Sequence, residues 1–318
     1  MSTNEQWLNT NKEKALEPDL PICDPHHHLW DLSINSYPWL DDGIDHFVGD
    51  YEKIRKNYLI SDFINSVGGL PIKKSVHVQA EWDPSLDPSG ETKWLQSIAD
   101  NEKSRGMPNA IIGFANLHKK NVDEILERHS SFPNWRGIRQ MLNWDDKRPN
   151  LRFAESGNLI TEERWIKGYK LLEKYNASFD LQVWPWQLQE CLSLARKFPN
   201  IFIILNHTGM PIDLSPDGIG LWKKGLKILA QADNVAVKIS ALGMMNKNWT
   251  KATIEPFVIE TIETFGPKRC MFASNFPVDS LFSDYKTLWK SFDQITKSFT
   301  KTERNQMFML NAERIYRI

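Results

Sequence analysis

The feature that most constrains the fold of this chain is a regular alternation of short apolar segments with longer amphipathic segments. The apolar segments have the length and residue types of β-strands, and each is followed by a segment of helical periodicity. The predicted strands are residues 22–28, 74–81, 110–115, 135–140, 178–184, 201–205, 235–239 and 269–273. The predicted helices are residues 51–66, 94–103, 122–129, 164–175, 188–197, 221–232, 254–265, 285–299 and 301–314. Strands that alternate strictly with helices are parallel and are joined by crossover connections.

Eight strand–helix units close naturally into a (β/α)8, or TIM, barrel. A length of 318 residues suits one such domain. An open doubly wound sheet is the competing α/β fold, but no Gly-x-Gly-x-x-Gly follows the first strand. We therefore predict a single barrel at residues 21–318, preceded by an N-terminal arm at residues 1–20 with a short helix at 5–15, and ending in an extra helix.

Composition excludes several classes of protein. The chain has 39 Lys and Arg against 40 Asp and Glu, so the net charge of -1 argues against a nucleic-acid partner or a polybasic membrane surface. No apolar run approaches the roughly 20 residues of a membrane span, and the polar N-terminus lacks the apolar core of a secretory signal. Cys23, Cys191 and Cys270 lie far apart in the sequence. We therefore expect a reduced, cytoplasmic protein.

The first predicted strand ends in three consecutive histidines. Alternation along a strand places His26 and His28 on one face and His27 on the other. Catalytic groups of a (β/α)8 barrel lie at the carboxyl ends of the strands, where this pair falls. Two such imidazoles could hold one divalent metal ion, zinc or manganese, or could polarise a substrate oxygen without a metal. The alternative is a histidine cluster without chemistry.

Further polar residues lie at the ends of the second and fourth strands. Gln79 and Glu81 end the second strand, although Glu81 could also be a structural ion-pair partner of an arginine. Arg136 and Arg139 are three residues apart, so only one of them should point into the barrel. We expect this to be Arg139, which is nearer the carboxyl end and could bind a substrate carboxylate bidentately.

The ends of the later strands add His207 and Asn275, with Asp279 a little beyond. His207 follows an apolar strand and is a candidate proton acceptor, and it is also a third candidate metal ligand beside His26 and His28. Trp30 and Trp184 also follow strands and could line a substrate pocket, although packing in the core would equally explain them. Together these groups are the mixture expected for attack of water on a carbonyl.

Four motifs resemble those of the amidohydrolase-related (amidohydrolase 2) hydrolases, nearest the sugar-lactone and 2-pyrone-4,6-dicarboxylate lactonases. They are Asp-Pro-His-His-His-Leu-Trp-Asp at 24–31, Gly-Ile-Arg at 137–139, Asn-His-Thr-Gly at 206–209 and Phe-Ala-Ser-Asn-Phe-Pro-Val-Asp at 272–279. The resemblance covers residues 21–318 and implies a distorted (β/α)8 barrel. It also implies hydrolysis of a carbon–oxygen or carbon–nitrogen bond in a small, often acidic, cyclic substrate. Some relatives bind a divalent metal, and others in the lactonase branch work without one.

One position departs from the family pattern. Relatives usually carry an aspartate, as metal ligand or general base, where this chain has Asn275. An amide cannot take a proton from water at neutral pH, but it can donate a hydrogen bond to an oxyanion or ligate a metal weakly through its carbonyl. His207 is then the expected base, with Glu81 or Asp279 in reserve.

The leading hypothesis is a hydrolase that opens a small acidic or sugar-derived lactone by water attack. His26 and His28 would polarise the carbonyl, Arg139 would bind the carboxylate, Asn275 would hold water or the oxyanion, and Gln79, Trp30 and Trp184 would contact the substrate. A decarboxylase or hydratase on the same scaffold is the first alternative, and a non-catalytic ligand-binding barrel is the second. We expect a small-molecule substrate, and the sequence leaves open whether the chain forms a homo-oligomer.

Overall fold

The computed structural model describes residues 20–41 and 48–318. The predicted helix at 5–15, and all of the predicted N-terminal arm except residue 20, lie outside the described residues. No helix within the described ranges is both long and apolar enough to cross a membrane.

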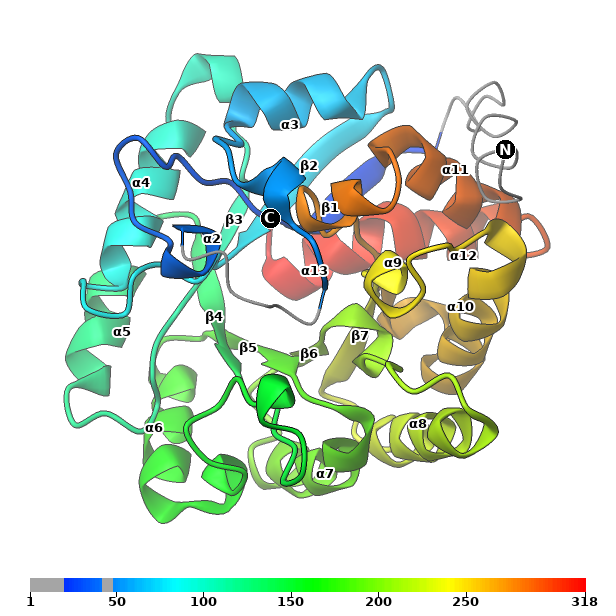
Figure 1. Cartoon of the computed structure of the whole chain (residues 1–318). Coiled ribbons are helices and arrows are strands. Elements are labelled where there is room, and N and C mark those ends of the chain that lie inside the picture. The colour runs from blue at the N-terminus through cyan, green and yellow to red at the C-terminus, as the bar shows by residue number, and fades with distance from the viewer. Residues whose placement is uncertain (1–19, 42–47) are drawn as a thin grey trace.

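Eight parallel strands form one sheet whose spatial order, β1 to β8, is also their order in the chain. They are β1 Ile22–His27, β2 Ile72–Val78, β3 Ala110–Gly113, β4 Trp135–Met141, β5 Ser178–Gln182, β6 Ile203–Leu205, β7 Val235–Ile239 and β8 Cys270–Phe272. Figure 1 looks onto the carboxyl ends of these strands and shows the helices as a ring around them. The predicted α/β barrel is confirmed.

The principal helices are α2 Pro38–Asp41, α3 Ile60–Val67, α4 Ser89–Ala99, α5 Val122–Ser130, α6 Glu163–Lys174, α7 Leu188–Lys197, α8 Pro216–Leu229, α9 Leu242–Met245, α10 Lys251–Phe265, α11 Tyr285–Ile295, α12 Lys301–Asn305 and α13 Asn311–Tyr316. The predicted starts of α4 and α8 were each five residues too late because local hydrogen bonds set them. The Ser215 hydroxyl caps α8 by accepting from the Gly218 N–H, and the Asp87 carboxylate accepts from the N–H of Ser89, the first residue of α4. The last predicted helix is interrupted by a π-helical turn between α12 and α13.

The barrel closes between β8 and β1 through residues just beyond the end of β8. The Asn275 N–H donates to the His26 carbonyl at 2.8 Å, and the His28 N–H donates to the Phe276 carbonyl at 2.7 Å. This closure is irregular because its hydrogen bonds are made by residues 275 and 276, which lie beyond the last residue of β8. It places Asn275 directly beside the histidine motif, residues 26–28.

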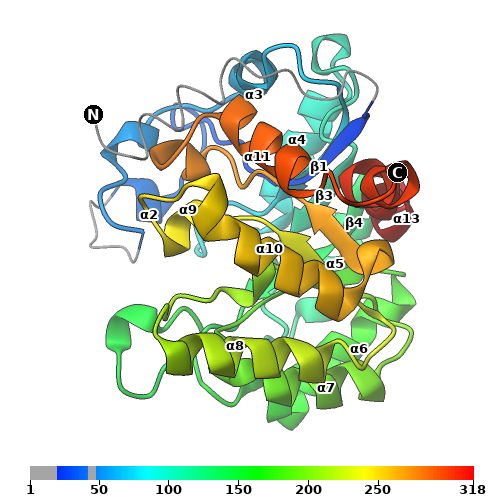
Figure 2. The ribbon, with the colours of Figure 1, turned by 90° about the vertical axis from the view of Figure 1, so that its right-hand side faces the viewer.

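The C-terminal helix α13 covers the amino ends of the strands. Its Ile315 and Tyr316 pack against inward-facing strand residues such as Val76 and Met271. Figure 2 shows α13 at one end of the barrel and α2 and α9 at the other. The amino end of the barrel is therefore filled by packed side chains, and the carboxyl end is where polar groups can meet a ligand.

Candidate functional site

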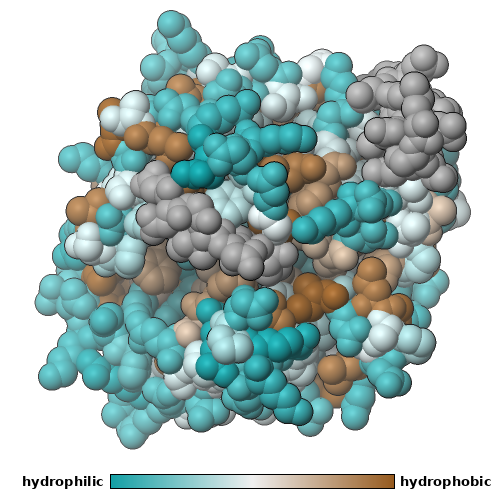
Figure 3. Space-filling view, in the orientation of Figure 1, coloured by the Kyte–Doolittle hydropathy of each residue, from teal (hydrophilic) through white to brown (hydrophobic). Residues whose placement is uncertain are grey.

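A cavity of about 200 Å³ opens at the carboxyl end of the barrel. Its polar lining residues come from β4, β5 and the segments after β1, β2, β6 and β8, and they are His28, Arg139, Gln182, Glu81, His207 and Asn275. Its apolar lining residues include Trp39, Val48, Met141, Phe153, Met244 and Val278. On this face of the molecule hydrophilic residues dominate the rim, and several hydrophobic residues lie nearer the middle (Figure 3).

Three histidines meet at the base of this cavity. The ring of His26 lies 5.0 Å from that of His28 and 4.5 Å from that of His207, measured between centroids. His27 points the other way and stacks on Phe63 of α3 at 4.2 Å, so strand alternation holds as predicted. His28 and His207 line the cavity, whereas His26 is fully buried beneath them.

All three imidazoles are neutral at ordinary pH. Burial, followed by the nearby charges of Lys238 and Arg139, lowers the pKa of His26 well below its usual value. Burial and then Arg139 do the same to the pKa values of His28 and His207. Neutral imidazoles both donate and accept, and the partner of one ring nitrogen decides the role of the other.

The His28 ring has a defined tautomer. Its Nδ1 lies 2.7 Å from the Val78 carbonyl oxygen, which can only accept. Nδ1 therefore carries the hydrogen, and Nε2 carries the lone pair. The Nδ1 of His207 lies 3.0 Å from the Ser240 hydroxyl, which can donate or accept and leaves either tautomer available.

Three of the cavity residues have left-handed backbone conformations. Glu81, His207 and Asn275 have φ of 62°, 55° and 57°. Such values are uncommon for residues other than glycine, and they concentrate at functional sites where the surrounding structure holds them. Each of the three falls just after a strand end, so the strained turn aims its side chain at the cavity.

Arg139 is buried and points into the barrel. It donates to the Gln182 side chain at 3.1 Å and to the Gln79 carbonyl at 2.6 Å, and its Nε has no partner among the described residues. Burial lowers its pKa, and nearby carboxylates oppose this shift. Arg136 lies at the surface against the Arg317 carbonyl, as alternation predicts. Gly137 permits the close approach of β4 to β5, because a Cβ there would lie 2.3 Å from the Ser178 carbonyl oxygen.

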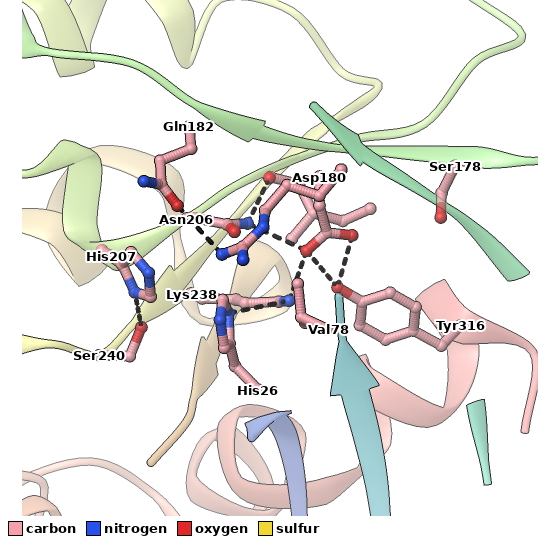
Figure 4. A network of polar contacts seen from close by, with 12 residues as sticks. His26, Val78, Ser178, Asp180, Gln182, Asn206, His207, Lys238, Ser240 and Tyr316 are labelled. Atoms are coloured by element: carbon pink, nitrogen blue, oxygen red, sulfur yellow. Dashed lines mark hydrogen bonds and ion pairs between the residues drawn. The ribbon is translucent and has the colours of Figure 1, made fainter. Parts of the chain in front are cut away.

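A buried ion pair beneath the cavity was missed by the sequence analysis. The Lys238 ammonium lies 2.5 Å from Asp180, and both side chains are fully buried. Figure 4 shows this pair between His26, Asn206 and Tyr316. The available signal was a lysine at an inward position of the apolar segment 235–239, where a charged residue is out of place.

Asn275 is held by two acceptors. Its Nδ2 donates to Asp279 at 2.6 Å and to the Met244 sulfur at 3.2 Å. Both amide hydrogens are thus engaged, and the carbonyl oxygen is the group left for the cavity. This differs from the expectation that Asn275 donates to an oxyanion. Burial raises the pKa of Asp279 to about 7, and Asp279 is not among the lining residues.

Comparison with known proteins identifies the family of this chain. The amidohydrolase family model matches residues 23–318. This chain belongs to the amidohydrolase family. An uncharacterized protein of Sinorhizobium fredii is 47% identical over 301 residues, covering 94% of this chain and 99% of its own length. The L-fucono-1,5-lactonase of Burkholderia ambifaria is 24% identical over 312 residues, covering 93% and 95%.

Solved structures of other amidohydrolases share the fold. A zinc-bound amidohydrolase of Burkholderia multivorans has a TM-score of 0.77 at 21% identity, covering 94% of this chain and 99% of its own. A probable 2-pyrone-4,6-dicarboxylic acid hydrolase of Acinetobacter baumannii has a TM-score of 0.68 at 16% identity, covering 93% and 99%. A manganese-bound 5-carboxyvanillate decarboxylase of Novosphingobium aromaticivorans has a TM-score of 0.64 at 12% identity, covering 95% and 97%.

The residues of this amidohydrolase do not form the predicted metal site. Within residues 20–41 and 48–318, no three His, Cys, Asp or Glu side chains are grouped so as to hold a metal ion. His26, His28 and His207 do converge, but they lack a carboxylate ligand because Asn275 stands in that place. The neighbouring cations, Lys238 and Arg139, further disfavour a divalent ion there.

Three residues predicted to contact the substrate lie behind the cavity wall of this amidohydrolase. The indole of Trp30 donates to the Lys56 carbonyl at 2.7 Å, and that of Trp184 donates to the Leu151 carbonyl at 2.8 Å. Gln79 bonds to Glu81 and supports it from below. The aromatic lining comes from Trp39 of the short helix α2 and Phe153 in a loop, which strand patterns do not locate.

Proposed function

We propose that this amidohydrolase opens the ring of a small carboxylated lactone by attack of water on the carbonyl carbon. The observation that carries the proposal is the placement of the Arg139 guanidinium beside neutral imidazoles in a cavity whose other walls are mostly apolar. The lactonase names of relatives such as the L-fucono-1,5-lactonase support the same reaction.

Arg139 anchors the substrate. Its hydrogen bonds to Gln182 and Gln79 use two of its five N–H groups, and a carboxylate is the ligand that matches the guanidinium fork. The rest of the ring would lie against Trp39, Met141 and Phe153. Such walls fit a planar, unsaturated lactone better than a sugar lactone, since each sugar hydroxyl would need its own polar partner.

His28 is the proposed base, in place of the sequence-predicted His207. Its Nε2 lone pair takes a proton from the attacking water, while the Asn275 carbonyl oxygen accepts the second hydrogen and orients the water. Water oxygen bonds to the carbonyl carbon, the ring carbon–oxygen bond breaks, and protonated His28 returns its proton to the departing alkoxide. The product is a hydroxy acid, and the base is regenerated.

Purified protein should be tested on a panel of unsaturated carboxylated lactones, their uncharged analogues and sugar lactones, with product analysis in ¹⁸O-labelled water. The proposal predicts one ¹⁸O in the hydroxy acid and turnover of the carboxylated lactones. His28→Gln should lower kcat by about 10²- to 10⁴-fold, the usual contribution of a general base. Release of carbon dioxide, or hydration of an alkene, would instead establish the decarboxylase or hydratase. Binding of ligands without turnover would establish the non-catalytic barrel.

A further inference from the structure

Lys238 and Asp180 form a charged pair in the interior of the barrel. Besides Lys238, Asp180 receives the Asn206 amide at 2.9 Å and the Tyr316 hydroxyl at 3.1 Å, and the Lys238 ammonium lies 5.2 Å from the centre of the Tyr316 ring. A buried ion pair is seldom favourable by itself, because removing both charges from water costs more than their attraction returns. Both charged groups of this pair have hydrogen-bond partners, yet the free energy needed to bury them points to a role beyond packing.

The same ammonium reaches the histidine motif. Lys238 Nζ lies 3.4 Å from His26 Nδ1, a contact drawn in Figure 4. An ammonium has three donors and no acceptor, so His26 Nδ1 must supply the lone pair. In a neutral imidazole the hydrogen then resides on Nε2. His26 Nε2 is buried and has no hydrogen-bond partner in the part of the chain that the structure describes.

We propose that Lys238 is a positioning residue that fixes His26 as the Nε2–H tautomer and places a positive charge beneath the histidine motif. His26 thereby becomes a donor at the base of the cavity, and it cannot ligate a metal through Nε2. The Val78 carbonyl fixes His28 in the opposite tautomer. The two adjacent imidazoles would thus carry opposite tautomers, with the hydrogen on Nε2 in His26 and on Nδ1 in His28.

The catalytic consequence rests on the proposed function. In that reaction the His26 Nε2–H, from beneath the cavity lining, would stabilise through space the charge that develops on the oxygen when water adds, while His28 takes the proton. The tautomer itself does not depend on any reaction. It can therefore be tested on the full chain without a substrate.

The test is a ¹⁵N NMR spectrum of the histidine rings, which separates protonated from unprotonated ring nitrogens. His26 would be assigned from the His26→Gln variant. The paired variant K238M/D180N removes both charges and avoids leaving one buried alone. Tyr316→Phe is the matched control, since it removes one hydrogen bond to Asp180 and leaves Lys238 in place.

The proposal predicts His26 with hydrogen on Nε2 in the wild type and in Tyr316→Phe, and loss of that preference in K238M/D180N. It also predicts that K238M/D180N binds zinc at least tenfold more tightly than the wild type, measured by dialysis and metal analysis. Hydrogen on His26 Nδ1 in the wild type, or an unchanged ring in K238M/D180N, would overturn it. If K238M/D180N does not fold, the wild-type spectrum still tests the proposal, because it shows which ring nitrogen of His26 carries the hydrogen. Failure of the lactone panel would leave these spectra unaffected, so the two proposals fail separately.

Discussion

At the scale of single residues, the pair of Asn275 and Asp279 explains how this chain accommodates an amide where the resemblance to the family's motif implies an aspartate. Asp279 accepts one amide hydrogen and Met244 accepts the other, so the Asn275 carbonyl faces the cavity. Asp279 is buried and its pKa is raised to about 7 by that burial. A second carboxyl at position 275 would therefore lie against an existing one.

Restoring the aspartate alone should destabilise the protein. In Asn275→Asp, two buried carboxyls would lie within hydrogen-bond distance and could share only one proton. We expect a loss of roughly 1–3 kcal/mol at pH 8 and less at pH 5, measured by urea denaturation. The control is N275D/D279N, which exchanges the two groups and should recover most of that loss. A single variant as stable as the wild type at pH 8 would contradict the arrangement.

Glu91 makes the stability of the protein depend on pH. Burial raises its pKa from 4.5 to about 8, and only its Oε1 has a partner among the described residues, the Ala80 N–H at 2.9 Å. Because the folded pKa exceeds the unfolded one, the stability that protonated Glu91 contributes is complete below about pH 4.5 and is lost as pH rises through 8.

Glu91→Gln should therefore become more stable than the wild type as pH rises. Gln cannot ionise, and each unit of pKa shift is worth about 1.4 kcal/mol, so we expect the difference in unfolding free energy to grow by roughly 2–4 kcal/mol between pH 5 and pH 9. Glu127→Gln on the exposed face of α5 is the control. A difference that does not change with pH would show that Glu91 ionises normally.

The sequence predicted which side chains point into the barrel where strand alternation decides it. His26, His28 and Arg139 were found in this way, and Arg136 and His27 were correctly placed outside. Alternation could not reveal which ring nitrogen carries a hydrogen, because that depends on Val78 and Lys238, residues distant in sequence. It also could not locate Trp39 or Phe153, because they enter the cavity from the short helix α2 and from a loop.

At the scale of elements, the junction of β1 with the end of β8 carries the site. Asp24 of β1 accepts the Ser274 N–H at 2.9 Å, the Ser274 hydroxyl at 2.6 Å and the Tyr285 hydroxyl of α11 at 2.8 Å. One buried side chain thus ties together the first strand, the segment after the last strand and a helix. The same junction sets the distance between Asn275 and the histidine motif.

Asp24→Ala should loosen this junction. Four buried donors, the His26 N–H among them, would lose their acceptor, and we expect a loss of roughly 3–5 kcal/mol in unfolding free energy. The control is Asp83→Ala, a solvent-accessible carboxylate that accepts from three groups, the N–H and hydroxyl of Ser85 and the hydroxyl of Ser36. Chemical denaturation should show a loss below about 1 kcal/mol for the control. Equal losses of unfolding free energy in the two variants would mean that the junction stabilises the fold no more than an exposed carboxylate does.

The existence and order of the elements could be predicted from the sequence, but several of their limits could not. The predicted strand 235–239 has the same limits as β7, because its apolar residues have clear ends. The predicted second strand extended to residue 81, whereas β2 ends at Val78, because Glu81 turns into a left-handed conformation. The helix predicted at 51–66 begins only at Ile60, after a short 3₁₀ turn at Glu52–Ile54.

At the scale of the whole molecule, the barrel has one filled end and one end open to a ligand. The C-terminal helix packs against the amino ends of the strands, where Lys74 of β2 pairs with Glu313 of α13 at 2.7 Å. All polar groups of the candidate site gather at the other end. This division places packed side chains below the cavity and leaves its mouth open to a small molecule.

The account predicts that the reaction needs no dissociable metal. Because no three metal-binding side chains are grouped within the described ranges, treatment with a chelator followed by dialysis should leave turnover unchanged within about twofold. Added zinc or manganese should not raise it. A loss of turnover that is restored by zinc or manganese would contradict this part of the account.

The central claim is that Arg139 recruits a carboxylate to imidazoles that open a lactone. It is tested most directly by kcat/KM for two lactones that differ only in a ring carboxylate, measured with the wild type and with Arg139→Lys. The wild type should prefer the carboxylated lactone by about 10- to 100-fold, the value of one or two charge-assisted hydrogen bonds, and Arg139→Lys should lose most of that preference because it lacks the planar fork. An equal preference in both proteins, or faster opening of the uncharged lactone by the wild type, would contradict the claim.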